Sequence, residues 1–386
     1  MSLKQLAYSA QQQLQTNTGV PFRRSHVYEL LAAALGFKSY AAFVSQAVPT
    51  HRSPNDKRAD PHSALVVTRC LDLGYRPDVA TATSAALRAF LTERRIGVIT
   101  ISALVSRLRG ELPDRDEDSV SDASGSPDDE HDDLRSPEEG PSDDSVDIPQ
   151  ITLDGLESAA SNGNALAHYA LALIHAPEDD AADEAAGSSY WYSQAQQGRV
   201  LAGVEKEWAD EHAAHLARSG QYLRYLREAG RLGNQDALLD LAERDGDPSF
   251  FELPRDRIGA NPSVVAEIAE QLGRNADAKH WLTVAAEGGD TDAMLRLIEE
   301  HDRADLPRSW TWVYLSQLLG EDLTADQHYA IDEHGREHDD EVGGPAYFAD
   351  RDGVRLEPLT SEQDANVRAT AQDLFERIQR STSSMP

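Results

Sequence analysis

A repeated Gly-x3-Ala pattern constrains the fold of this 386-residue chain more than any other feature of its sequence. The pattern occurs four times in residues 149–325, and successive glycines are separated by 35, 35 and 56 residues. Its members are Gly163 with Ala167, Gly198 with Ala202, Gly233 with Ala237, and Gly289 with Ala293. A period of this length is typical of helical repeats, in which each unit buries its apolar face only by stacking on its neighbours.

The residues around each glycine keep the same register. The positions four and three before it carry small side chains in most copies, and the position eight before it is aromatic in three copies: Tyr190, Tyr225 and Trp281. The first copy has Gly155 there instead. Small residues let neighbouring helices approach closely, and glycine adopts the left-handed backbone that ends a helix. We therefore predict stacked helix–turn–helix units whose aromatic side chains belong to the repeat core.

Two segments are the best copies of this pattern: 280–290, with the sequence HWLTVAAEGGD, and 190–198, with the sequence YWYSQAQQG. They resemble the Sel1-like repeat, a relative of the tetratricopeptide repeat, whose pattern has an aromatic, two small residues, a turn glycine, an alanine and a leucine. The resemblance implies a right-handed superhelix whose concave face holds partner proteins. It also implies an adaptor or regulatory role, not catalysis. No cofactor and no small-molecule substrate are expected. A degenerate further copy around residues 259–263 would account for the 56-residue step.

Charge divides the chain unevenly around its net value of −31. Residues 1–110 hold 14 Lys and Arg against 6 Asp and Glu, whereas residues 111–148 hold 16 acidic residues and two arginines. The latter segment has almost no large apolar side chains, which predicts a disordered acidic linker. We therefore predict an all-α chain with an α-helical module at 1–110, a linker at 111–148, Sel1-like repeats at 149–325 and an acidic extension at 326–386. In this extension, an amphipathic helix is expected to cap the repeats.

The N-terminal module offers an alternative function. Residues 29–40 look like the first helix and turn of a DNA-binding helix-turn-helix, with Arg23, Arg24 and Lys38 as candidates for phosphate contacts. The helix that follows offers only Ser45 and the next glutamine for reading base edges, fewer polar side chains than a recognition helix carries. A structural helical hairpin is therefore preferred, and a nucleic-acid-associated regulator is the alternative.

A metal site is a further alternative, because His328, His334 and His338 precede a run of acidic residues. Gly335 disfavours the helix that would place His334 and His338 on one face, so a solvated polar loop is preferred and no metal is expected.

The segment 350–353 (DRDG) faintly resembles a calcium loop. The preferred interpretation is an Asp-Gly hairpin turn between 347–348 and 354–356.

The remaining features concern the subcellular localisation of the protein. Cys70 is the only cysteine, which excludes an intramolecular disulfide. The N-terminal segment lacks the apolar stretch of a signal peptide, and about 18 consecutive apolar residues occur nowhere. We expect a cytoplasmic, non-enzymatic scaffold whose partner is another protein, without a membrane partner.

Overall fold

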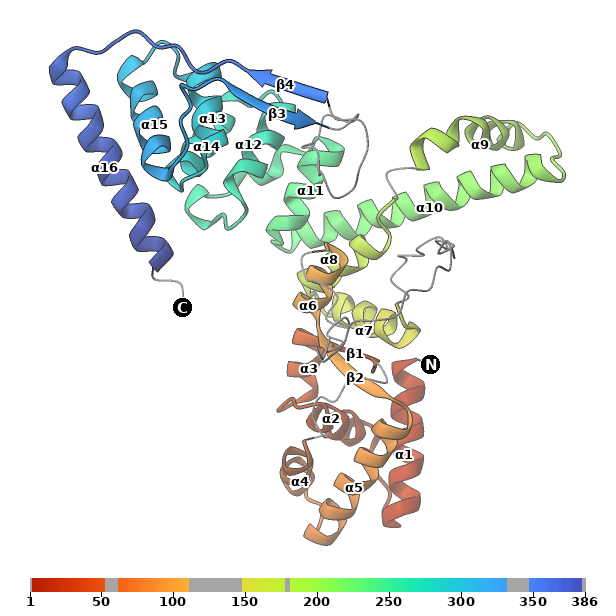
Figure 1. Ribbon diagram of the computed structural model, residues 1–386. Helices are drawn as coiled ribbons and strands as arrows, with labels where there is room; N and C mark the ends of the chain where they lie inside the picture. The colour runs from red at the N-terminus through yellow and green to blue at the C-terminus, as the bar shows by residue number, and fades with distance from the viewer. Residues whose placement is uncertain (1, 53–61, 111–147, 178–180, 332–346, 384–386) are drawn as a thin grey trace, which may run out of the picture. The chain divides into compact units, whose positions relative to one another are not determined.

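The computed structural model of the chain is mostly helical, which agrees with the predicted class (Figure 1). It describes residues 2–52, 62–110, 148–177, 181–331 and 347–383. The predicted acidic linker therefore lies outside the described residues, apart from its last residue. The chain forms two compact units, Met1–Leu238 and Leu239–Pro386.

The first unit consists of helices and one pair of strands (Figure 1). Its N-terminal helices α1, α2, α4 and α5 pack together, and α10 contacts both α8 and α9. The elements are α1 (Leu3–Thr18), α2 (Arg24–Ala34), α3 (Tyr40–Gln46), β1 (Ala47–His51), α4 (Ser63–Asp72), α5 (Pro77–Glu93), β2 (Ile96–Thr100), α6 (Ile101–Leu108), α7 (Gln150–Ser161), α8 (Ala165–Ile174), α9 (Ala181–Gln196) and α10 (Val204–Arg231).

The strand pair was not predicted. β1 and β2 are antiparallel, and their register pairs Ala47 with Thr100 and His51 with Ile96. The prolines and polar residues of 49–61 favour a loop, but the first three of these residues belong to β1. A strand of five residues has little signal of its own, and the partner of this one lies about fifty residues away, so no local pattern indicated it.

The helix α7, which follows the acidic segment, packs against β1. The hydroxyl of Thr152 donates to the carbonyl of Pro49 over 3.0 Å. A Cβ at Gly155 would lie 2.9 Å from Pro49 Cδ and 3.0 Å from Val48 Cβ, so the first copy carries glycine where later copies carry an aromatic ring. Elements on both sides of the acidic segment therefore belong to the same compact unit.

Three of the four Gly-x3-Ala copies form the same turn. Each glycine has a positive φ, and the residue after it caps the next helix by accepting a hydrogen bond from the alanine amide. The φ values are 84° at Gly163, 92° at Gly233 and 103° at Gly289. The bonds join Ala167 to Asn164 (3.1 Å), Ala237 to Asn234 (2.7 Å) and Ala293 to Asp290 (2.9 Å), and all three alanines are buried.

The copy at Gly198 departs from this geometry. Gly198 ends α9 with a φ of 90°, as predicted. Ala202, however, is exposed and lies in a non-helical segment, and α10 begins only at Val204. The predicted role of Ala202 in packing two helices is therefore wrong.

In the 56-residue step between Gly233 and Gly289, residues 259–263 lead into a helix and do not form the glycine turn of the other copies. Asn261 caps α12 (Pro262–Gln271), and the glycine that separates α12 from the next helix is Gly273, with a φ of 67°. The other elements here and in the rest of the chain are α11 (Gln235–Asp245), the 3₁₀ turns η2 (Pro248–Glu252) and η3 (Arg255–Arg257), α13 (Asn275–Glu287), α14 (Thr291–Arg296), the π-helical turn η4 (Leu297–His301), α15 (Leu306–Leu319), β3 (Gln327–Ile331), β4 (Tyr347–Arg351) and α16 (Ser361–Ser383).

The C-terminal extension contains the predicted amphipathic helix, α16. α16 packs along α15, and it buries Val367, Ala371 and Leu374 (Figure 1). Before it, β4 pairs with β3 in antiparallel fashion. The predicted hairpin between residues 347–348 and 354–356 is therefore wrong, because residues 347–348 pair with an earlier strand.

Candidate functional site

The predicted aromatic positions of the repeats differ in burial. Trp281 is 4% exposed and belongs to the core of the second unit. Tyr225 is half-buried and stacks on the ring of His175, with the ring centroids 5.8 Å apart. Tyr190 is 53% exposed, so the prediction that it fills the core is wrong. It lies on α9, whose main contact is with α10.

The predicted nucleic-acid contacts do not gather at one place. Arg23 and Arg24 stand at the start of α2, whereas Lys38 follows its end. The helix α2 itself has eleven residues and a length of about 16 Å at 1.5 Å per residue. The helix expected to read bases, α3, has only seven residues and packs against α7. The carbonyl of Ser45, on that helix, accepts a hydrogen bond from Asn164.

A groove in the second unit lies between α16 and the helices α13 and α15. Its volume is about 940 Å³. Trp312, Val367 and Leu374 are its apolar lining, while Arg377 and Asp373 are among the charged residues that line it. Three contacts of Tyr314 hold α16 in place: its hydroxyl donates to Asp364 and accepts from Arg368 over 2.9 Å, and the Arg368 guanidinium lies 3.9 Å from the centre of its ring.

A buried ion network stabilises the α13–α15 side of the groove. The carboxylate of Asp302 is 1% exposed and lies 2.6 Å from Lys279 Nζ and 3.0 Å from Arg308 Nε. It also accepts a hydrogen bond from Trp312 Nε1 over 3.2 Å. Lys279 belongs to α13, whereas Arg308 and Trp312 belong to α15 and line the groove. The carboxylate is buried, but its two cations are 39% and 38% exposed, so each ion pair stabilises the fold by less than a fully buried pair would.

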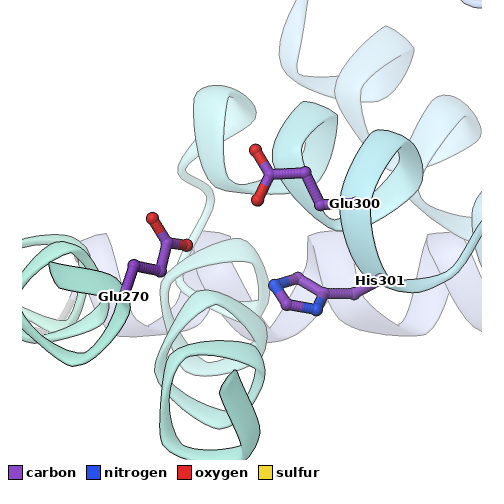
Figure 2. A group of neighbouring side chains, drawn as sticks. All are labelled: Glu270, Glu300 and His301. Carbon is purple, nitrogen blue, oxygen red and sulfur yellow. The ribbon is translucent and has the colours of Figure 1, made fainter. Parts of the chain in front are cut away.

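A second cluster of polar side chains lies close to this network in the sequence and comes from two elements. Figure 2 shows Glu270, at the end of α12, facing Glu300 and His301 of the π-helical turn η4. One potential ligand atom from each of the three side chains lies within 4.8 Å of the other two. Arg296 forms an ion pair with Oε2 of Glu270. Among the described residues, this is the group whose donor atoms could hold a metal ion.

The sequence did not indicate this cluster. The metal alternative rested on His328, His334 and His338. The last two lie outside the described residues, as does the side chain of the first. Glu270 is 30 residues away from Glu300, and no fixed spacing connects carboxylates on two different helices. The adjacent Glu-His pair at 300–301 was the only local signal available.

Comparison with known proteins gives no match: no family model, no curated protein and no solved structure is significantly similar to this chain. The residues and contacts described above are therefore the basis for a functional assignment. Among the helices of the described residues, none has the length and apolar character needed to cross a membrane.

Proposed function

We propose that this chain is a non-enzymatic protein-binding scaffold built on Sel1-like helical repeats. The observation that carries the proposal is the groove beside α16, which combines an apolar lining with charged residues of both signs. Interfaces that bind proteins have this composition, and tryptophan and arginine contribute most to their affinity. The recurring turns at Gly163, Gly233 and Gly289 support the repeat assignment.

The partner expected in this groove is a polypeptide segment. Arg377 and Asp373 are exposed and offer ion pairs to a partner that carries both charges, whereas Val367 and Leu374 are buried and contribute little apolar surface. The wall formed by α15 is held rigid by the buried Asp302, which reduces the entropy lost on binding. Binding through the groove, rather than through the predicted nucleic-acid residues, is favoured because those residues are spread over both ends of α2.

Site-specific photo-crosslinking tests the proposal. A photoreactive amino acid replaces Thr370, an exposed residue that lines the groove, in the full chain. The matched control places it at Gln372, which is exposed on α16 at about 200° from Thr370 around the helix axis. We expect a protein crosslink from position 370 that position 372 does not give.

Two outcomes would contradict the scaffold proposal. Equal crosslinking from both positions would mean that the groove has no preferred partner. A complex that disappears after nuclease treatment would instead favour the alternative, a nucleic-acid-associated regulator.

A further inference from the structure

The donor set of Glu270, Glu300 and His301 has the composition of a transition-metal site. It combines one imidazole nitrogen with two carboxylates, and it is drawn from two separate elements. Magnesium and calcium prefer oxygen ligands, whereas imidazole together with carboxylate suits zinc and its neighbours in the periodic table. The two carboxylates bring two negative charges to the site, and the Arg296 cation, which pairs with Glu270, offsets one of them.

Two of the three side chains carry an unsatisfied polar atom. Oε1 of Glu270 and Nε2 of His301 are shielded from solvent, and neither has a hydrogen-bond partner among the described residues. A buried polar atom without a partner costs about 1–3 kcal/mol. Because both atoms belong to the same cluster, one ion between them would satisfy both at once.

The backbone explains why two consecutive residues take part. The amide of Asp302 donates to the carbonyl of Leu297 over 2.6 Å, which closes the wider π-helical turn. Such turns are rare and occur frequently at functional sites. This turn brings both Glu300 and His301 near the end of α12, as Figure 2 shows.

We propose that Glu270, Glu300 and His301 bind a zinc ion with three protein ligands and leave one coordination position open. Zinc bonds of about 2.0–2.2 Å place tetrahedral ligands about 3.5 Å apart, so the donor atoms must approach one another slightly. The exposed side chain of Glu300 can close this gap, and it provides the path by which the ion enters. Arg296 contacts Oε2 of Glu270, orients the carboxylate and leaves Oε1 for the metal.

The test is a titration of the full, chelator-treated chain with Zn²⁺, followed by calorimetry, and with Co²⁺, followed by visible absorption. We expect one tight site per chain and the intense absorption of four-coordinate cobalt. His301→Gln and Glu270→Gln should each weaken this site by more than about 100-fold, because loss of a ligand exceeds the 10- to 100-fold effect typical of an outer-shell contact.

The matched control is His338→Gln, which removes an imidazole from an acidic segment outside the cluster. This variant should keep the tight site. Glu300→Gln tests the same site through an exposed side chain whose replacement does not disturb the core, and as the loss of a ligand it should also weaken binding by more than about 100-fold. Tight binding retained in His301→Gln and Glu300→Gln, loss of binding in His338→Gln, or no stoichiometric binding by the unmodified chain would each overturn the proposal.

Discussion

The two ends of α10 carry the same Gly-x3-Ala pattern and fold differently. At its C-terminal end, Gly233 stops the helix, Asn234 caps α11, and Ala237 is buried. Before its N-terminal end, Gly198 stops α9 in the same way, but Ala202 is exposed outside any helix. The glycine conformation is therefore shared, and the difference arises after it.

The residue that follows the glycine separates the two cases. Asn234 offers a side-chain oxygen to the amide of Ala237, whereas arginine at position 199 has no acceptor to offer. The cap is not the only factor, because Arg274 follows Gly273 without capping α13 and that helix still begins at Asn275. There the next residues favour a helix, whereas Val200 and Gly203 follow Arg199. The Gly-x3-Ala spacing thus predicts a turn at the glycine. Whether a second helix follows directly depends on the hydrogen-bond acceptor of the next residue and on the helix propensity of the residues after it.

The largest expected effect comes from enlarging the two alanines. Ala237→Leu should destabilise the chain by about 1–3 kcal/mol, because it inserts a side chain into a packed core. Ala202→Leu should change stability by less than about 0.5 kcal/mol, because this position is exposed. Urea unfolding followed by circular dichroism measures both. Equal losses in the two variants would mean that Ala202 is packed as the repeat pattern predicts.

Removing the cap should have a smaller effect. Asn234→Ala deletes the acceptor for the Ala237 amide and should cost about 1 kcal/mol. The matched variant, Arg199→Ala, removes no cap and loses only an exposed contact with the Trp191 ring and a long ion pair to Glu205. Its cost should stay below about 0.5 kcal/mol. The same unfolding measurement compares the two, and a cost at Arg199 as large as that at Asn234 would contradict the distinction.

A third variant is designed to give the segment before the N-terminal end of α10 the capped turn found at its C-terminal end. Arg199→Asn supplies an acceptor, and Gly203→Ala removes a residue with a φ of 56° that interrupts the path into α10. The double variant should form a helix from position 200 onwards, with a net stability change within about 1 kcal/mol. Hydrogen exchange of the Ala202 amide reports the outcome, since the new cap should protect it. An unchanged exchange rate would show that the acceptor and Gly203 do not account for the difference.

Local features were predictable from the sequence, whereas features that join distant segments were not. The turn at Gly289 and the buried face of α16, with Val367 and Leu374, follow from patterns within one or two helical turns. The pairing of Ala47 with Thr100 depends on two segments that carry no mutual signal. The ion pairs of Asp302 beside the groove were not predictable either, because their cations, Lys279 and Arg308, come from two other helices.

The contact between α8 and the C-terminal half of α10 should also depend on pH. Burial lowers the pKa of His168 and His175, both of which lie near the Tyr225 ring. The two imidazoles are therefore harder to protonate in the folded state than in the unfolded chain, where their pKa has the ordinary value of about 6.5. Stability should fall as the pH drops below about 6.5 and level off once the pH passes below the pKa of the two histidines in the folded state.

This effect should be the smallest of the four predicted effects on stability, because both imidazoles are partly exposed to solvent. His175→Phe keeps a ring against Tyr225 without a titrating group, so the difference in urea midpoint between pH 7.5 and pH 5.5 should shrink. If the variant loses as much stability on acidification as the unmodified chain, His175 does not contribute to the pH dependence of this half of α10.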